Sequence, residues 1–260
     1  MRGGQWQVLR LLRGLRERSL ESILLAPRRS PLAERASREG FPVERISLQF
    51  PAGDLVHAHD ARGHTIAALL SRTPVVVARR VAYPVKRGWL SHWKYRRAAH
   101  FIAVSQFVAG MLREAGVAAD RITVVHDGVP LLPLSTRTGE VIEMAKSASN
   151  LEEKLLHARL LVYVTDAEGL GSGALLAMSA GVPVIASRVG GLPEVIEDGV
   201  NGLLIGNEPD APAQAIARLE ADPAEAQRLA ANARRTIEER FTVERMVEDT
   251  IAVYHRVLHV

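Results

Sequence analysis

The sequence predicts an α/β protein of two domains built on parallel β-sheets, and three observations lead to this prediction. Apolar runs of four to seven residues alternate with helix-period stretches, a pattern typical of βα units around a parallel sheet. Several apolar runs end directly in polar residues, as at His57-Ala58-His59-Asp60. The segment Pro130–Asn150 carries prolines, serines and threonines, which indicates a linker between the two halves.

Residues 1–130 are expected to form the first domain. Its strands are predicted at Ser22–Ala26, Val43–Leu48, Leu55–Ala58, Pro74–Ala78, His100–Val104 and Ile122–Val125. Its helices are predicted at Gln5–Arg18, Pro31–Glu39, His64–Ser71, Trp89–Ala98 and Gln106–Ala115. Because open α/β sheets bind ligands at the carboxyl ends of their strands, we expect a site where these strands end.

The second half follows a linker that runs into a predicted helix at Val141–His157, so that residues 131–157 connect the domains. Further strands are predicted at Leu160–Thr165, Pro183–Ser187 and Gly202–Ile205. Helices are predicted at Pro209–Ala221, Pro223–Arg240 and Val243–Val260, each starting at a proline or after Thr242 as its cap. Residues 158–242 are therefore expected to form the second domain, and residues 243–260 a final helix that packs back on the first.

Composition excludes several classes of protein. The content of 47% hydrophobic and 24% charged residues is that of an ordinary globular chain with a buried core. The sequence has no cysteine, which excludes disulfides, thiolate metal sites and cysteine nucleophiles. It lacks both the apolar core of a signal peptide and an uncharged apolar run long enough to span a membrane, so we expect a cytoplasmic protein.

Charge is distributed unevenly between the halves. Residues 1–130 hold 21 Lys and Arg against 10 Asp and Glu, a net charge of +11, while residues 131–260 hold 12 against 19, a net charge of −7. A basic half suits nucleic acid, an anionic membrane surface or a phosphorylated substrate. An arginine-rich composition inherited from a GC-rich genome is the alternative explanation.

The most informative stretch is Thr165–Glu197, in which a predicted strand runs into a glycine-containing loop and then a helix. The first turn of a helix has free backbone amides, and Gly169 and Gly171 would let a ligand approach closely, which suits a diphosphate. Glu168, at the mouth of the loop, could accept hydrogen bonds from sugar hydroxyls. On physical grounds alone, a loop that merely turns the chain is the alternative.

This stretch resembles the donor-binding signature of the retaining family 4 glycosyltransferases, in which E-G-x-G opens a helix ending L-E-A-M-A-x-G-x-P-V-I-A-S, followed by G-G-x-x-E. The matching residues are Glu168, Gly169, Gly171, Ala177, Met178, Gly181, Pro183, Val184, Ile185, Ala186, Ser187, Gly190, Gly191 and Glu194. Segments similar to other family motifs are Gly3–Leu9, Asp54–Asp60, Ile102–Ser105, Val124–Val129 and Asp198–Leu204.

The resemblance implies two Rossmann-like domains of the GT-B type that face each other across a cleft, the second of them truncated. It implies that the second domain binds a nucleotide-sugar donor, and the first a hydroxyl acceptor that could be a glycan, a lipid or a small molecule. In the family, the donor phosphate deprotonates the acceptor on the face from which it leaves, so the sugar is transferred with retention. No metal, other cofactor or nucleic acid is implied, and the basic half would favour the inner face of the membrane.

The site residues implied by the resemblance come from both halves. Glu168 is the expected catalytic residue. The expected donor-binding residues are Gly169, Leu170, Gly171 and Ser172. The residues expected to hold the acceptor or a phosphate are Gly3, Gly4, His59, Asp60, Arg79 and Arg80.

The chain departs from the family pattern in the donor half. Leu176 stands where the family has the second Glu of its E-x7-E pair, which holds the ribose, and its loss is expected to weaken nucleotide binding by roughly 1–3 kcal/mol. The family's G-R-x-x-x-x-K-G segment, which grips the diphosphate, has no counterpart in residues 129–159. Lys146 and Lys154 lie there, but on a predicted helix without a nearby glycine, so both are expected to be solvated.

The first half departs from the pattern as well. The family places a buried strand before the loop that matches Gly3-Gly4, so either the true start lies upstream or the first sheet lacks a central strand. Arg79-Arg80 stand where many members have a histidine, and they could bind phosphate. His57 and His59 form a His-x-His pair, but no third ligand is close in sequence and we expect no metal there.

Two hypotheses on function remain open, an active glycosyltransferase of reduced size and a degenerate, non-catalytic relative that acts as a binding or partner protein. A basic nucleic-acid-binding protein is a third hypothesis, which rests on charge alone.

Overall fold

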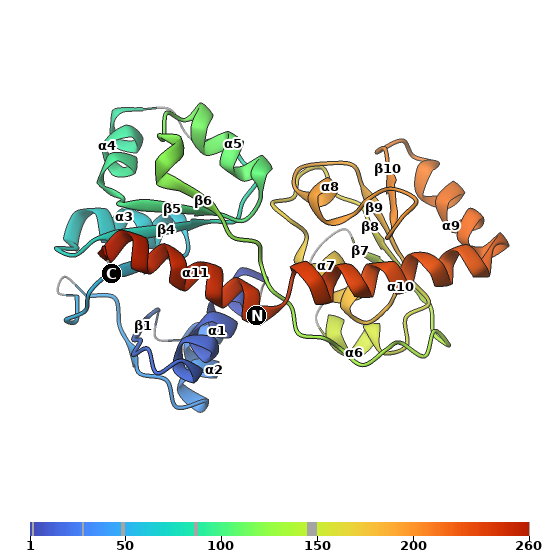
Figure 1. The fold of residues 1–260 in the computed structure, drawn as a ribbon, viewed down its shortest axis with the longest axis horizontal. Helices are drawn as coiled ribbons and strands as arrows, with labels where there is room; N and C mark the ends of the chain where they lie inside the picture. Colours follow the sequence, from blue (N-terminus) through green and yellow to red (C-terminus); the bar gives the residue numbers. More distant parts are fainter. Residues whose placement is uncertain (2, 28, 48–49, 86–87, 145–149, 260) are drawn as a thin grey trace.

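The computed structural model describes residues 1, 3–27, 29–47, 50–85, 88–144 and 150–259, which form two α/β domains side by side (Figure 1). All strand pairs in the sheets are parallel, and helices cover both faces of each larger sheet. Buried parallel sheets need this double cover because their strands are apolar on both faces. The fold class predicted from the sequence, two Rossmann-like domains, is confirmed.

The strands of the first domain lie in two separate sheets. The larger sheet has the order β3-β4-β5-β6, with strands Val56–Ala58 (β3), Val75–Arg79 (β4), His100–Ala103 (β5) and Ile122–Val124 (β6). The smaller sheet pairs Leu24–Leu25 (β1) with Val43–Glu44 (β2). Most of the predicted strands are thus confirmed in shorter form, and the strand predicted at Pro74–Ala78 is shifted by one residue to Val75–Arg79. Leu48, at the end of one prediction, lies outside the described residues.

A polar side chain caps the start of three helices of the first domain, Pro31–Arg38 (α2), Ala61–Leu70 (α3) and Gln106–Glu114 (α5). The domain also has the helices Gly3–Glu17 (α1) and Trp89–Arg97 (α4), and a 3-10 turn at Ala119–Arg121 (η1). Ser30 accepts a hydrogen bond from the Ala33 N–H of α2, and Ser105 caps α5 in the same way. The Asp60 side chain accepts from the Gly63 N–H, which starts α3 three residues before the predicted position.

Successive side chains along the strands point to opposite faces of the sheet, which divides the core of the first domain into two layers. Val77 and Phe101 lie in the layer that includes α5, whereas Val76 and Ile102 pack against α1 and the last helix. The residues on either side of the sheet are therefore fixed by the period of two along each strand.

The second domain has a sheet of order β10-β9-β8-β7. Its strands are Val141–Met144 (β7), Leu160–Tyr163 (β8), Val184–Ser187 (β9) and Leu203–Ile205 (β10). Its helices are Leu151–Leu155 (α6), Ser172–Ser179 (α7), Leu192–Val195 (α8), Ala211–Ala221 (α9) and Pro223–Arg240 (α10). Helices α7 and α9 contact the sheet, and α10 packs along α7.

The helix predicted at Val141–His157 is wrong. Residues 141–144 form β7 instead, paired in parallel with β8, and only Leu151–Leu155 is helical in the described part. The β-branched Val141 and Ile142 can form backbone hydrogen bonds to a neighbouring buried strand, and this pairing overrides the helical propensity of the following residues. Residues 145–149, including Lys146, lie outside the described part.

The last helix returns to the first domain. Helix α11, Val243–Leu258, lies along α1 and also contacts β5 (Figure 1). The crossing with α1 is close, because a Cβ atom placed on Gly14 would lie 2.9 Å from Cγ1 of Val247 and closer still to Cγ2. The final helix therefore ties the two ends of the chain together.

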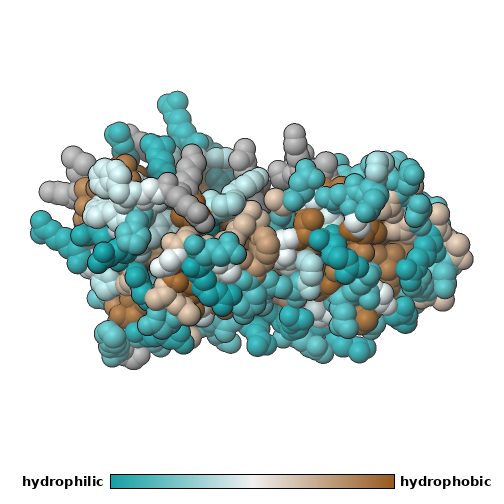
Figure 2. All heavy atoms as spheres, turned by 90° about the horizontal axis from the view of Figure 1, so that it is seen from above, coloured by the Kyte–Doolittle hydropathy of each residue, from teal (hydrophilic) through white to brown (hydrophobic). Residues whose placement is uncertain are grey.

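One cluster of buried side chains runs through both domains. It includes Phe101 and Leu112 of the first domain, Leu161 and Leu175 of the second, and Phe241 between α10 and α11. The two sheets are therefore joined by continuous packing rather than by a linker alone. The outer surface seen from above the view of Figure 1 is mostly hydrophilic, with scattered hydrophobic residues (Figure 2). Over the described residues, no helix is both long and apolar enough to cross a membrane.

The same substitution in two helices tests the α1–α11 crossing. Gly14→Ala is expected to lower the free energy of unfolding by about 1–3 kcal/mol, because the added methyl group overlaps the stiff Val247 side chain. Gly110→Ala in α5, where a Cβ meets nothing within 4 Å, should instead raise it by about 0.5–1 kcal/mol. Urea unfolding measures both, and equal shifts in the two variants would contradict the close crossing.

Candidate functional site

The two domains touch where α1, the end of β4 and the loop before α7 come together. The start of the chain lies at the junction of the domains in Figure 1. A Cβ atom on Gly3 would lie 2.5 Å from Oγ of Ser172. A Cβ atom on Gly169 would overlap the carbonyl oxygen of Arg80. Glycine at both positions lets the backbones of the two domains approach closely.

Two helices begin at this junction. Gly171 precedes α7 with a φ of 101°, a left-handed conformation that favours glycine, and no side chain in the described part caps the helix. Helix α1 has no acidic residue in its first turn. Since the first N–H groups of a helix lack intrahelical partners and carry partial positive charge, the junction is suited to an anion.

Glu168 is held in place by its neighbours. The Tyr163 hydroxyl donates to its Oε2 at 2.5 Å, and the Gly169 N–H donates to its Oε1 at 2.9 Å. Burial raises the pKa of Tyr163, and the Glu168 carboxylate raises it further, so the phenol stays protonated and can donate. The carbonyl of Glu168 also accepts from the Gly191 N–H at 3.1 Å. Both carboxylate oxygens keep lone pairs for a further donor.

Arg80 lies at the centre of a polar chain on the first domain. Its Nε donates to Oδ1 of Asp127 at 2.9 Å, and its Nη1 lies 3.2 Å from Nδ1 of His59. The ring of His59 is 4.0 Å from that of His57, whose Nδ1 is 2.7 Å from the Tyr254 hydroxyl of α11. The chain thus runs from the last helix to the domain junction.

His57 and His59 are neutral at physiological pH. Burial, with a smaller effect from Arg80, lowers the pKa of His57 to about 3. Burial also lowers the pKa of His59, to which His57 and Arg80 add. A neutral His59 can accept a hydrogen bond from the guanidinium of Arg80 without repelling it.

Arg79 and Arg80 point to different neighbours. Adjacent residues of a strand project to opposite faces. Arg79 therefore turns toward α4, where its Nη1 donates to the Tyr95 hydroxyl at 3.1 Å and its Nη2 to the Tyr83 carbonyl. Asp60 is likewise engaged elsewhere, as the cap of α3. The expected acceptor or phosphate residues are thus not all gathered at one point.

Gly3 and Gly4 open helix α1, whereas Gly169, Leu170 and Gly171 lie in the loop before α7. Leu170 is buried in the core, so its side chain is not available to a ligand. Gly4 lies beside Gly3, and a Cβ atom there would meet nothing within 4 Å. Open space therefore adjoins the start of α1.

Glu194 was among the residues that matched the family motif but was not predicted as a site residue. Its carboxylate accepts from the N–H groups of Gln106 at 2.7 Å and Phe107 at 2.8 Å, at the start of α5. His126 Nε2 lies 3.5 Å from Oε2. Burial alone would raise the pKa of Glu194, but the hydrogen bonds to His126, Gln106 and Phe107 outweigh it and lower the pKa. Glu194 of α8 thus joins the second domain to the first.

Arg10 was also missed from the sequence. It is buried on α1, where its Nη1 donates to the Gly128 carbonyl at 3.0 Å and its Nη2 to Glu152 at 3.4 Å. Burial lowers its pKa, an effect that Glu152 and Asp127 oppose. Arg10 is one of three arginines in a leucine-rich helix and gave no sequence signal, because the residues that it contacts are more than a hundred positions away.

Leu176 and Lys154 were both expected not to contribute to nucleotide binding. Leu176 is half-buried and packs against the main core cluster. Lys154 is exposed on α6. Among the described residues, no group of three or more His, Asp or Glu side chains is placed to hold a metal ion; whether the protein uses one stays a prediction.

Comparison with protein-family models gives two matches. Residues 45–131 match the model for Glycosyltransferase Family 4, and residues 134–236 match the model for Glycosyl transferases group 1. The two matches lie in the first and second halves of the chain, one after the other. They support a glycosyltransferase family of the GT-B type.

Curated relatives agree with this. N-acetyl-alpha-D-glucosaminyl L-malate synthase of Bacillus anthracis is 35% identical over 111 residues, which cover 42% of this chain and 29% of that protein. D-inositol 3-phosphate glycosyltransferase of Nocardiopsis dassonvillei is 31% identical over 209 residues, 79% of this chain and 41% of that protein. The chain thus spans less than half the length of these relatives.

Solved structures share the fold at low identity. The crystal structure of Anabaena Alr3699/HepE in complex with UDP has a TM-score of 0.79 at 18% identity, covering 98% of this chain and 96% of that chain. The same protein in complex with UDP-glucose has a TM-score of 0.77. The chain therefore has the GT-B fold.

The contact made by Glu194 predicts a pH-dependent stability. Glu194→Gln should lower the free energy of unfolding by about 1–2 kcal/mol at neutral pH, because an amide has a single acceptor oxygen for two N–H groups. The native pKa of Glu194 is below its unfolded value. The stabilisation is therefore complete above about pH 4.3 and is lost as the pH falls through the native pKa.

Urea unfolding of both proteins across a pH series measures this difference. The two stabilities should converge in acid. A difference that stays constant down to the most acidic pH at which the protein folds would show that the Glu194 carboxylate has no ionic role.

Proposed function

We infer that a chain with the GT-B fold, whose two halves both match glycosyltransferase models, transfers a sugar from a nucleotide-sugar donor to a hydroxyl acceptor. The observation that carries this proposal is the meeting of α1 and α7 at Gly3 and Ser172. Two helix starts at one point supply several backbone N–H groups and two positive dipole ends. In a sugar transfer, the diphosphate of the donor is the anion that such a site would bind.

Arg80 is proposed to supply the formal positive charge. Its carbonyl contacts Gly169 of the donor loop, so the residue stands where the two domains meet. Asp127 and His59 hold the guanidinium in one orientation. A fixed cation in a partly buried site stabilises the leaving diphosphate without the cost of reorganisation. Arg80 would thereby take over the role of the Arg and Lys that the family has in its longer segment.

The proposed reaction breaks the bond between the sugar C1 and the diphosphate oxygen and forms a bond from C1 to the acceptor oxygen. The acceptor proton passes to the departing diphosphate on the same face, which gives retention. Charge that develops on the diphosphate would be met by Arg80 and the amides of Gly171 and Ser172. We expect this reaction to need no metal ion, because these groups already supply the positive charge.

Glu168 is proposed to orient the sugar. Its carboxylate is held by Tyr163 and Gly169, which fixes the direction in which it can accept hydrogen bonds from hydroxyl groups. The acceptor would bind on the first domain beside Gly4 and the neutral His59, since both adjoin the junction. It could be a glycan, a lipid or a small molecule. The reaction would take place in the cytoplasm, at the inner face of the membrane if the acceptor is a lipid.

UDP is the nucleotide that we propose to test first. The Anabaena protein with the same fold was solved with UDP and with UDP-glucose. The low identity to that protein leaves the sugar undetermined, so the test needs several UDP-, GDP- and ADP-sugars.

A non-catalytic relative that only binds is the second candidate. The observation that favours it is Leu176, which packs into the core where the family has a carboxylate for the ribose. This candidate shares the donor site but makes no transfer. Binding and turnover must therefore be measured separately.

Donor binding should depend on the close approach at Gly169. Gly169→Ala is expected to weaken binding of the nucleotide-sugar roughly tenfold or more, because the methyl group forces the Arg80 carbonyl and the donor loop apart. Gly53→Ala is the control, since a Cβ atom there meets nothing within 4 Å. Calorimetry measures both, and absence of heat with every sugar nucleotide in the unmodified chain would exclude the donor site altogether.

Turnover should depend on Glu168. Glu168→Gln is expected to reduce transfer, or slow donor hydrolysis without an acceptor, by about 10²-fold or more while the chain still binds the nucleotide. NMR of the released sugar before it mutarotates should show the α-anomer from an α-linked donor. A β-anomer refutes retention. If the unmodified chain binds the nucleotide-sugar but makes no turnover, the non-catalytic candidate is supported.

A further inference from the structure

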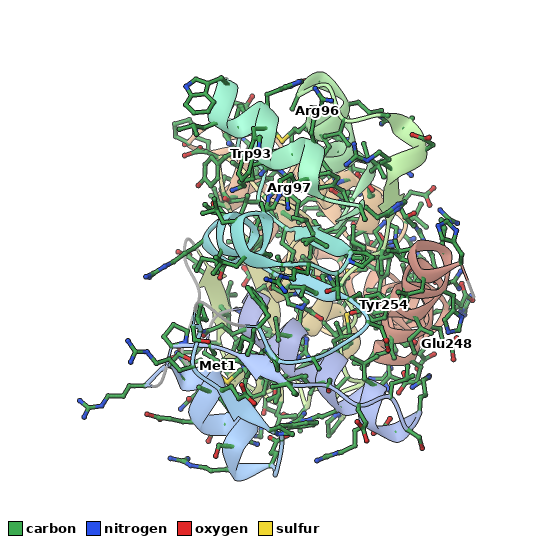
Figure 3. All side chains as sticks on the ribbon, turned by 90° about the vertical axis from the view of Figure 1, so that its left-hand side faces the viewer. Met1, Trp93, Arg96, Arg97, Glu248 and Tyr254 are labelled. Atoms are coloured by element: carbon green, nitrogen blue, oxygen red, sulfur yellow. The ribbon has the colours of Figure 1, made fainter. Side chains whose placement is uncertain are left out.

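Helix α4 carries large apolar side chains that face away from the core. None of its residues is buried, and Trp89 and Leu90 are 78% and 60% exposed. Tyr83, in the loop before the helix, is 65% exposed. The helix lies at the outer end of the first domain, away from the second domain (Figure 1). Figure 3 shows Trp93, Arg96 and Arg97 together on it.

The same region is basic without interruption. From Ala61 to Arg113 the sequence has ten Lys and Arg residues and no Asp or Glu. Arg96 and Arg97 are exposed, and within the described part of the chain neither makes an ion pair. The Arg97 guanidinium lies 5.8 Å from the centre of the Trp93 ring. Cations and aromatic rings therefore alternate on one surface with no neutralising partner.

An open cavity lies within this surface. Its volume is about 420 Å³, and its lining consists of Trp89, His92, Trp93, Arg96 and Arg97. Two tryptophans, one histidine and two arginines thus line the same cavity. This combination suits a ligand with an apolar body and an anionic head.

We propose that this surface, formed by Tyr83, Trp89, Leu90, Trp93, Arg96 and Arg97, docks on a bilayer that contains anionic phospholipid. Tryptophan and tyrosine favour the membrane–water interface, where the ring is apolar and the N–H or O–H group is hydrated. Arginines beside them are attracted to anionic headgroups. The segment from Ala61 to Arg113 contributes no acidic side chain that would repel such headgroups.

The aliphatic residues favour a bilayer over a nucleic acid. Leu90 on α4 and Val81 in the loop before it are both strongly exposed. Nucleic-acid bases stack on aromatic rings but make no comparable contact with aliphatic side chains. The acyl region of a bilayer, in contrast, buries aliphatic side chains favourably. The mixture of tryptophan, leucine and arginine therefore indicates a lipid surface.

The loop before α4 connects this surface to the domain junction. The chain passes from Arg80, beside Gly169, through Val81 and Tyr83 to Trp89. Arg79 ties this loop and the helix to β4 through the Tyr83 carbonyl and the Tyr95 hydroxyl. Docking through α4 would thus act on a loop that starts beside the junction and is anchored to β4, whether or not the chain transfers a sugar.

Sedimentation of the full chain with vesicles tests this proposal. We expect binding to vesicles of phosphatidylcholine mixed with phosphatidylglycerol, little binding to phosphatidylcholine alone, and loss of binding at high salt. Arg96→Ala with Arg97→Ala should weaken the partition coefficient roughly 25-fold, about fivefold for each cation. Trp89→Ala with Leu90→Ala should weaken it about tenfold or more.

Matched substitutions on the second domain serve as controls. Arg235→Ala and Val200→Ala change an exposed cation and an exposed apolar residue there, and neither should alter binding. Circular dichroism checks that all variants fold. No binding to the mixed vesicles at low salt, equal losses in the controls, or binding to single-stranded DNA that these vesicles do not compete away would each overturn the proposal.

Discussion

The close approach of two backbones at the domain junction is the constraint on which the rest of the site depends. Gly169 passes against the carbonyl of Arg80, and Gly3 against the side chain of Ser172. A side chain at Gly169 would overlap the Arg80 backbone and push the domains apart, and one at Gly3 would require the Ser172 side chain to move. The proposed anion site thus depends on the absence of a Cβ atom at two positions that are 166 residues apart in the chain.

The surrounding contacts hold this approach in place from both sides. Glu194 binds the start of α5 across the junction, Arg10 fixes the end of the first domain through Gly128, and α11 returns from the second domain to pack on α1. Arg80 is oriented within the same framework by Asp127 and by a neutral His59. The cation proposed to meet the diphosphate is therefore part of the structure that joins the domains. Binding and domain association should be coupled for this reason.

Local patterns predicted most of the fold, while contacts over long sequence separation account for what they missed. The predicted helix at Pro223–Arg240 is confirmed at both ends. The proline at its start is a signal that lies in the local sequence. Val141–Met144 was predicted as helix, since only its pairing with Leu160–Tyr163 makes it a strand. For the site, the glycine motif predicted Glu168 and its neighbours, and their role stays a prediction. The roles of Glu194 and Asp127 depend on partners in distant segments, which no local pattern contains.

The most direct test of this account is a titration of the labelled chain with UDP-glucose, followed by the backbone amide signals in the NMR spectrum. If a diphosphate binds between the two helix starts, the amides of Gly3, Gly4, Gly171 and Ser172 should shift most, with one common saturation curve. Shifts confined to other residues, or none at millimolar ligand, would contradict the claim that the two helix starts form a donor site.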